Sequence, residues 1–147
     1  MIKVNFKKLN ENAVIPAMAT PGSAGMDLRA CIDSDVIINP GERALISTGL
    51  AIALESNAYV AYIYARSGLA VKSGITLANC VGVIDSDYRG EIMVSLHNHS
   101  LEEQSIADFE RVAQMVIAPF LKVDYTEVDE LTDTVRGEGG FGSTGKK

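Results

Sequence analysis

The sequence LAIALESNAYVAYIY, residues 50–64, contains two apolar segments of different kinds. In the first, Leu50, Ile52 and Leu54 alternate with alanines, and this period of two predicts a half-buried strand. The second segment, from Tyr59 to Tyr64, is continuously apolar and rich in tyrosine and β-branched residues, which predicts a strand covered on both faces. Two short strands in close succession favour a fold built from strands.

The same alternation of apolar and polar residues recurs along the chain. It predicts further strands over residues 2–6, 92–96 and 121–125. Turn-forming pairs fall between the segments, at Pro21-Gly22, Pro40-Gly41, Ser73-Gly74 and Arg89-Gly90. Many short strands with regular breaks predict an all-β fold, a jelly-roll-like barrel or sandwich.

One segment has a helical pattern instead. Ser100 and Glu103 fit a capping box, and apolar residues follow at roughly helical spacing. A short helix within residues 101–110 therefore stays open as an alternative to irregular structure. Residues 112–118 are rich in β-branched side chains and stop before a proline, so we expect them to be extended.

Composition restricts the class of protein. The chain has 147 residues with a formal net charge of −6, which suits one domain and disfavours binding to nucleic acid or to an anionic membrane. No apolar run approaches the roughly 18 residues of a membrane span. Cys31 and Cys80 lack metal-site spacing, and the first residues do not resemble a signal peptide. We therefore expect free thiols and a cytoplasmic protein.

The glycine-rich end, RGEGGFGSTGKK at residues 136–147, has no hydrophobic period. It predicts a flexible C-terminal arm that follows a folded domain over residues 1–135. Its glycines match a dinucleotide fingerprint and a P-loop by letter. The first match lacks the flanking strand and helix and the acidic residue about 20 positions on, and the second lacks the Ser or Thr after its lysine and the helix that follows. The glycine backbone, the hydroxyls and Arg136 can wrap a polyphosphate, and a solvated terminus is the alternative.

Four polar motifs interrupt the predicted strands: AGMDL at 24–28, ARSGL at 65–69, GVIDSDYRG at 82–90 and RVAQ at 111–114. Together with the arm they form five motifs whose order resembles that of the trimeric deoxyuridine triphosphatase (dUTPase) family, from about residue 24 to residue 145. The resemblance implies hydrolysis of dUTP to dUMP and pyrophosphate by attack of water on the α-phosphate. Such an enzyme keeps uracil out of DNA and supplies dUMP for thymidylate synthesis.

The resemblance also implies catalytic and metal-binding roles. Asp85 would orient and deprotonate the attacking water, and Gln114 would contact that water or the α-phosphate. Asp27 would approach the Mg²⁺ cofactor on the triphosphate through the water ligands of the ion. Without the resemblance, both aspartates would be interpreted as turn residues. Arg111 is interpreted as structural, an ion-pair partner for a neighbouring carboxylate.

Substrate-binding roles follow from the same resemblance. A phosphate clamp is expected at the start of a short helix, formed by Arg66, Ser67 and Gly68. The uracil edge would be read by the amide of Asn79 and by the backbone of Gly82, Val83 and Ile84, while the ring of Tyr88 packs under the deoxyribose. On the arm, Arg136 would reach the γ-phosphate, Phe141 would stack on uracil, and the closing segment would include Gly142, Ser143 and Thr144.

In this family each site gathers the second and fourth motifs of one subunit, the third motif of another and the arm of the third. The resemblance therefore implies a homotrimer that binds dUTP at its subunit interfaces. Ala65 departs from the proline that is usual before Arg66, which affects rigidity more than chemistry. Residues 105–110 lack the Pro-Gly turn that the family commonly shows before its fourth motif.

Two other functions remain as alternatives. The related dCTP deaminases usually carry an arginine four residues after the serine of the second motif, where this chain has Val71. Val71 argues for hydrolysis without deamination. A bifunctional deaminase and hydrolase is the smaller remaining alternative, and a non-catalytic nucleotide-binding oligomer is the other. His97 and His99 lack partners at metal-ligand spacing, so we expect them to be ordinary surface residues.

Overall fold

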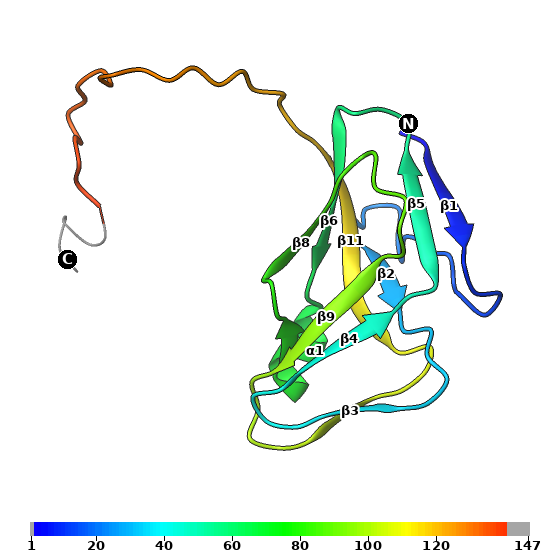
Figure 1. Ribbon diagram of the computed structural model, residues 1–147. Helices are drawn as coiled ribbons and strands as arrows, with labels where there is room; N and C mark the ends of the chain where they lie inside the picture. The colour runs from blue at the N-terminus through cyan, green and yellow to red at the C-terminus, as the bar shows by residue number, and fades with distance from the viewer. Residues whose placement is uncertain (1, 141–147) are drawn as a thin grey trace.

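The computed structural model describes residues 2–140 of the chain. Its largest element is a four-stranded antiparallel sheet in the order β2, β11, β6, β8. These strands are Met26–Arg29, Arg111–Pro119, Tyr59–Tyr64 and Val81–Ile84. Figure 1 shows β11 running through the middle of the molecule, between β2 and β6.

Three smaller antiparallel sheets complete the fold. One has three strands in the order β4, β9, β7, which are Arg43–Ser47, Met93–Asn98 and Ile75–Leu77. The others are pairs, β1 (Val4–Lys8) with β5 (Leu50–Leu54) and β10 (Gln104–Ile106) with β3 (Val36–Ile38). The sheets stay separate, so the described strands form a jelly-roll-like sandwich and no closed barrel.

The core lies between the sheets. Leu28 and Met115 of the four-stranded sheet are buried in the same cluster as Ile46 and Leu96 of the three-stranded sheet. Burying aliphatic side chains from two sheets against one another is the main favourable term in such a sandwich, on the order of 1.5–3 kcal/mol for each large side chain. This packing holds the long strand β11, which carries one of the predicted motifs, at a fixed position.

Most of the predicted strands are confirmed, with small shifts at their ends. Strands at 50–54 and 59–64 match β5 and β6, and those at 2–6 and 92–96 correspond to β1 and β9. The strand predicted at 121–125 is wrong, because this segment pairs with no strand among the described residues. Its side chains at Leu121 and Tyr125 are 87% and 88% exposed. Alternation alone does not make a strand when no neighbour accepts its backbone hydrogen bonds.

The alternative of a helix within residues 101–110 is also wrong. These residues contain β10, which pairs with β3, and turns on either side of it. The Ser100 oxygen accepts from the Glu102 N–H at 3.3 Å, and its hydroxyl donates to the buried Asn98 Oδ1 at 2.7 Å, so Ser100 stabilises a turn and caps no helix. Within residues 2–140 the one helix is α1, Ser67–Ser73, which ends at Gly74 in the left-handed conformation with φ of 66°.

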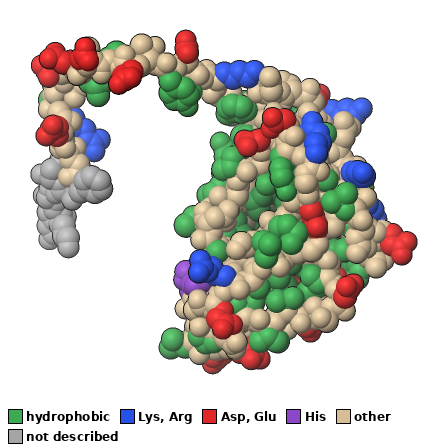
Figure 2. Space-filling model, viewed as in Figure 1, with side chains coloured by type: hydrophobic (Ala, Val, Ile, Leu, Met, Phe, Trp, Pro, Cys, Tyr) green, Lys and Arg blue, Asp and Glu red, His purple; other side chains and the backbone are tan. Residues whose placement is uncertain are grey.

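After β11 the chain leaves the sheets. The backbone N–H of Phe120 still donates to the Ala58 carbonyl at 3.0 Å, and the segment that follows runs away from the body of the molecule (Figure 1). Acidic side chains gather along this segment in Figure 2. No helix within the described part of the chain has the length and apolar composition that a membrane crossing requires.

Candidate active site

One group of predicted site residues lies on neighbouring strands of the four-stranded sheet. Gln114 of β11 is directly opposite Asp27 of β2 on one side and Tyr64 of β6 on the other. Asp27 and Gln114 both line a cavity of about 390 Å³, together with Ser23 and Gly25. We call this group, with Arg66, the acid–amide half-site.

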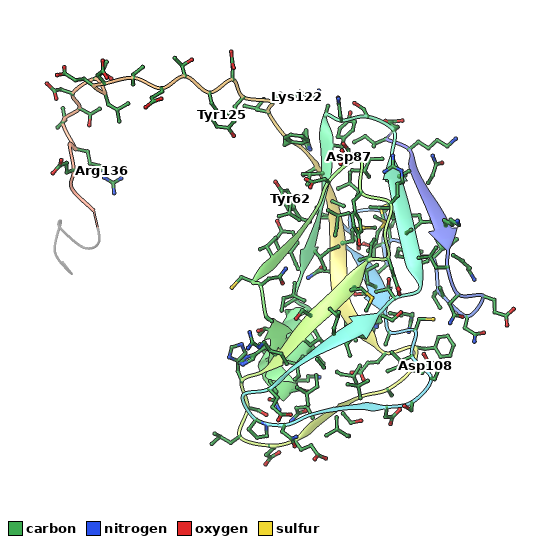
Figure 3. The ribbon with its side chains drawn as sticks, viewed as in Figure 1. Tyr62, Asp87, Asp108, Lys122, Tyr125 and Arg136 are labelled. Carbon is green, nitrogen blue, oxygen red and sulfur yellow. The ribbon has the colours of Figure 1, made fainter. Side chains whose placement is uncertain are left out.

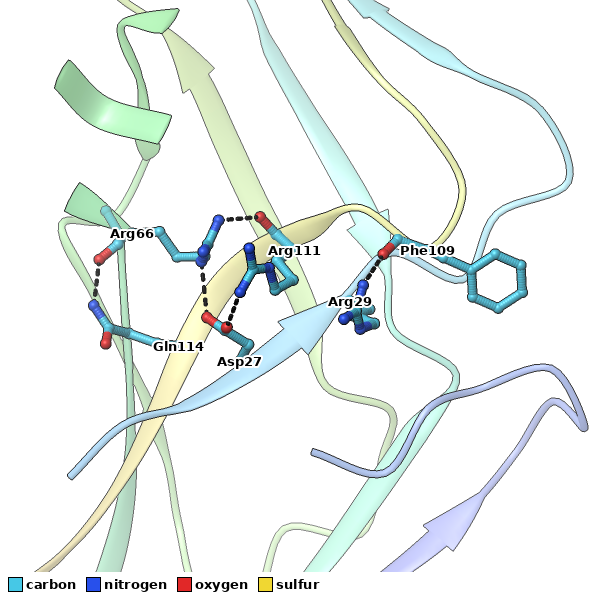
Figure 4. A network of polar contacts seen from close by, with 7 residues as sticks. Asp27, Arg29, Arg66, Phe109, Arg111 and Gln114 are labelled. Carbon is cyan, nitrogen blue, oxygen red and sulfur yellow. Dashed lines mark hydrogen bonds and ion pairs between the residues drawn. The ribbon is translucent and has the colours of Figure 1, made fainter. Parts of the chain in front are cut away.

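The carboxylate of Asp27 is held between two guanidinium groups (Figure 4). The Nε of Arg66 donates to Oδ1 at 2.8 Å, and an Nη of Arg111 donates to Oδ2 at 3.1 Å. A further bond runs from Arg66 to the Arg111 backbone carbonyl at 3.1 Å. The interpretation of Arg111 as an ion-pair partner is therefore confirmed, and two cations against one carboxylate leave an excess of positive charge here.

Gln114 links this half-site to the second motif. Its Nε2 donates to the Ala65 carbonyl at 2.9 Å, immediately before Arg66. A Cβ placed on Gly25 would lie 2.5 Å from the Gln114 Oε1, so only glycine leaves room for the amide in this position. The sequence analysis did not find this steric role of Gly25. The only sequence feature that pointed to this role is the presence of a small residue inside the first motif.

The second motif turns from β6 into α1. Arg66 precedes the helix with an extended backbone, φ of −86° and ψ of 131°. Ser67 and Gly68 follow in the first turn and are exposed, and a Cβ on Gly68 would meet no atom within 4 Å. The first N–H groups of a helix have no partner within it, so this turn offers free donors next to the Arg66 side chain.

The third motif forms a separate half-site on β8 and the loop after it. Four of its residues surround a cavity of about 220 Å³ together with Glu91 and Met93: Val83, Ile84, Asp85 and Tyr88. We call this the hairpin half-site. Asn79 lies in the turn before β8, and a Cβ on Gly82 would approach Ile63 within 3.0 Å.

Glu91 shapes the hairpin half-site, although the sequence analysis did not select it. Its backbone carbonyl accepts from the Tyr88 hydroxyl at 2.9 Å, and its carboxylate accepts from the Ser47 hydroxyl and from the Gly49 N–H at 2.7 Å. A Cβ on Gly90 would overlap the Tyr88 hydroxyl, so glycine is required beside the ring. The sequence feature that could have identified Glu91 is its position as an acidic residue directly after the Arg89-Gly90 turn.

The two half-sites lie apart within one chain. β2 and β8 are the outer strands of the four-stranded sheet, and three strand spacings separate them by about 14 Å. Ile84 pairs with Ala61, three residues along β6 from Tyr64, which adds a displacement of about 10 Å along the strands. The structure therefore brings Asp27, Arg66 and Gln114 together but does not bring Asp85 to them.

The arm lies away from both half-sites. Arg136 is at the far end of the segment after β11 (Figure 3), where its Nε donates to the Gly139 carbonyl at 2.8 Å. The other predicted arm residues lie outside the described part of the chain: Phe141, Gly142, Ser143 and Thr144.

Comparisons with known proteins agree with this arrangement of motifs. The sequence model of the dUTPase family matches residues 11–145. The deoxyuridine 5'-triphosphate nucleotidohydrolase of Neisseria meningitidis serogroup B is 53% identical over 146 residues, which cover 98% of this chain and 97% of that protein. The protein of the same name from Nautilia profundicola is 57% identical over 145 residues, which cover 99% of this chain and 100% of that protein.

The fold is similar to that of a solved dUTPase. The dUTPase of Staphylococcus bacteriophage 80alpha, in a structure with dUPNHPP, matches with a TM-score of 0.87 and 27% identity over 97% of this chain and 98% of that chain. The match over nearly the whole length, with all five motifs present, confirms the resemblance found in the sequence. The chain belongs to the dUTPase family.

Proposed function

We propose that this chain hydrolyses dUTP to dUMP and pyrophosphate by attack of water on the α-phosphate. The observation that supports this function is the pair of complementary half-sites. One presents two guanidinium groups, an amide and a carboxylate, which suit a polyphosphate; the other presents a carboxylate beside an aromatic ring in a small cavity. A nucleoside triphosphate has the same division, with charge at one end and a ring at the other.

The proposed site needs more than one copy of the chain, because the half-sites are apart within each copy. In the homotrimer that we propose, one subunit supplies Asp27, Arg66 and Gln114, a second supplies the hairpin half-site, and the third supplies the arm. Apolar side chains on the segment after β11 support such packing, since Leu121, Tyr125 and Leu131 are each at least 87% exposed in the isolated chain.

The chemistry assigned to these residues is simple. Asp85 accepts a proton from the water while the water oxygen bonds to the α-phosphorus. The bond from that phosphorus to the oxygen that bridges to the β-phosphate then breaks and releases pyrophosphate. Arg66, with Ser67 and Gly68, binds the phosphate oxygens on which negative charge accumulates. Gln114 orients the water or the α-phosphate from its position next to Asp27.

Magnesium enters this reaction as part of the substrate. Within residues 2–140 no three side chains of the ligand-forming types converge on one point, which fits an ion carried by the triphosphate. Asp27 is a hard oxygen donor in the acid–amide half-site, and its bonds to two arginines suit contact through the water ligands of the ion. Bound Mg²⁺ would neutralise part of the triphosphate charge.

Selection of base and sugar is assigned to the hairpin half-site. Asn79 and the backbone of Gly82, Val83 and Ile84 would read the uracil edge, and Tyr88 would pack under the deoxyribose. From the arm, Arg136 would reach the γ-phosphate, Phe141 would stack on the base, and the segment would close with Gly142, Ser143 and Thr144. Closure excludes water other than the nucleophile.

A direct assay tests the function. Pyrophosphate release is measured from dUTP, dCTP, dTTP and UTP, with Mg²⁺ and with excess chelator, and ammonia release is measured from dCTP. We expect rapid, magnesium-dependent release from dUTP alone. Ammonia from dCTP would indicate a deaminase, and binding of dUTP without turnover would indicate a nucleotide-binding oligomer. The unpaired thiols of Cys31 and Cys80 suit a reducing compartment, and we propose the cytoplasm.

A further inference from the structure

A third cavity lies outside both half-sites, over the three-stranded sheet. Its volume is about 430 Å³, and its polar lining comes from Arg43, Thr76, Cys80, His97 and His99. None of the residues that line this cavity lines the 390 Å³ cavity or the 220 Å³ cavity. Figure 2 shows a histidine surface beside a cationic side chain.

The register of the sheet explains how these side chains come together. His97 on the central strand β9 is directly opposite Arg43 of β4 and directly opposite Thr76 of β7. Directly paired residues on antiparallel strands project from the same face, so a guanidinium, an imidazole and a hydroxyl form one row across the sheet. His99 lies two residues beyond His97, and their ring centroids are 4.1 Å apart.

The row carries positive charge that no residue of this part of the structure neutralises. No carboxylate lines the cavity, and the two ion pairs within residues 2–140 both involve Asp27 and not Arg43. This is unusual for a chain with a net charge of −6. A guanidinium beside two imidazoles is therefore a site where an anion gains electrostatic stabilisation.

The imidazoles are also held in defined orientations. The Nε2 of His97 donates to the Gly41 carbonyl at 3.2 Å, because a carbonyl oxygen only accepts. Its Nδ1 is buried and has no hydrogen-bond partner among the described residues. The Nε2 of His99 lies 2.8 Å from the Thr76 hydroxyl. Because Nε2 carries the proton, Nδ1 of the neutral ring is an acceptor, and leaving it buried without a partner costs free energy that a hydroxyl donor on a bound group would remove.

We propose that this cavity binds a phosphate group, with the Arg43 guanidinium as its principal donor and His97, His99 and Thr76 as supporting partners. Hydrogen phosphate has oxygens that accept from Arg43 on β4 and Thr76 on β7, and its one hydroxyl can donate to the Nδ1 of His97 on β9. The volume exceeds that of a bare phosphate ion, and Leu77 and Ala78 line the rest of the space. The ligand is thus inorganic phosphate or the phosphate of a small monoester. This proposal does not depend on the proposed hydrolysis.

The chain offers a selective probe, because it contains only two histidines and both line this cavity. Inorganic phosphate is titrated into the full-length protein at pH 7 and constant ionic strength, and the two histidine ring signals are followed by NMR. We expect saturable shifts of both signals with phosphate and none with chloride. Equal responses to the two ions would overturn the proposal.

Variants connect the response to the cavity. Arg43→Gln should weaken phosphate binding at least about tenfold, as expected for loss of a charge-assisted hydrogen bond, and Arg43→Lys should restore part of it. Lys3→Gln removes the same charge from an exposed position outside the cavity and should leave the affinity unchanged. Unchanged binding by a folded Arg43→Gln protein would contradict the assignment.

The acid–amide half-site is a second place where phosphate can bind, so it needs its own control. Ala65 lines the cavity and also accepts from Gln114, which makes the two sites neighbours. Arg66→Gln should leave the histidine response intact. If Arg66→Gln abolished the histidine shifts, the two signals would be responding to phosphate bound at the acid–amide half-site. The proposal of a separate site would then be rejected.

A second titration identifies the form of the ligand. Phenyl phosphate carries the same charged group as inorganic phosphate and adds an apolar ring. Tighter binding of phenyl phosphate would support a monoester whose organic part lies against Leu77 and Ala78. Equal affinities would support the inorganic ion, and failure of both probes to bind would overturn the proposal.

Discussion

The Nε of Arg66 donates to the Oδ1 of Asp27 at 2.8 Å and joins two motifs that are 39 residues apart in the sequence. This bond orients the guanidinium beside the first turn of α1, while Arg111 holds the other carboxylate oxygen. The pair is partly exposed, so its contribution to the free energy of unfolding is small, about 0–1 kcal/mol. Its importance is positional, because it keeps a positive charge in place before any substrate binds.

Replacement of Asp85 tests the proposed general base. We expect Asp85→Asn to bind dUTP but to hydrolyse it at least about a hundredfold more slowly, since an amide cannot accept the proton. The measurement is single-turnover pyrophosphate release together with a binding titration. Asp87→Asn is the matched control in the same loop, and it should retain near-normal turnover because Asp87 does not line the hairpin half-site. Near-normal turnover by Asp85→Asn would refute the role.

Arg111 is a positioning residue in this arrangement. Arg111→Ala leaves Asp27 with one partner, so we expect KM for dUTP to rise several-fold while kcat changes less. The free energy of unfolding should change by less than about 1 kcal/mol. Arg111→Lys should recover part of the affinity. The control is Arg29→Ala, the register partner of Arg111, whose side chain bonds the Phe109 carbonyl and not Asp27.

Two glycines of one loop separate a steric effect on Gln114 from a general effect on the loop. Gly25→Ala places a methyl group 2.5 Å from the Gln114 Oε1, whereas Gly22→Ala meets no atom within 4 Å. We expect kcat/KM to fall roughly tenfold in Gly25→Ala, as one oriented hydrogen bond is lost. Gly22→Ala should behave like the unmodified protein. Equal activity of the two variants would show that the Gln114 orientation does not matter.

Truncation after Val135 tests the proposed arm. The strands and the core lie before this residue, so the truncated protein should keep its melting temperature and its oligomeric state. Hydrolysis of dUTP should be nearly abolished, because Arg136 and the residues after it are missing. Calorimetry, sedimentation and the pyrophosphate assay measure the three properties. A truncated protein that melts early or dissociates would show that the arm is structural.

The two cysteines should differ in reactivity. Burial raises the pKa of the Cys31 thiol, and the carboxylates of Asp108 and Glu91 add to this effect, whereas Cys80 is exposed. Iodoacetamide should label Cys80 in the folded protein and Cys31 only after unfolding, as read by mass spectrometry. Because the folded pKa of Cys31 lies above the unfolded value, its contribution to stability is present below the usual thiol pKa and is lost at more alkaline pH. Cys31→Ala should flatten that alkaline loss, and early labelling of Cys31 would contradict the assignment.

Sequence patterns predicted strands correctly where the fold supplies a neighbouring strand, even one far away in the sequence. Residues 50–54 pair with β1, and residues 59–64 pair with β11 on one side and β8 on the other, so both segments form strands. The same alternation at 121–125 has no neighbouring strand within residues 2–140. The capping box at Ser100 started no helix, because residues 104–106 pair with β3 and the Ser100 oxygen accepts from the Glu102 N–H of a turn. In both failures the tertiary structure overrode a local preference, through the lack of a partner strand at 121–125 and through the pairing of β10 with β3 in residues 101–110.

The sequence by itself determined which residues are expected to carry the chemistry, since the five motifs and their order are properties of the chain alone. It also determined the family, and through it the roles expected of Asp27, Arg66, Asp85 and Gln114. Only the tertiary structure decided where those residues lie, because strand order and register are set by pairing between distant segments. Those pairings put Asp27 and Asp85 toward opposite edges of one sheet and aligned Arg43, His97 and Thr76 in a single row.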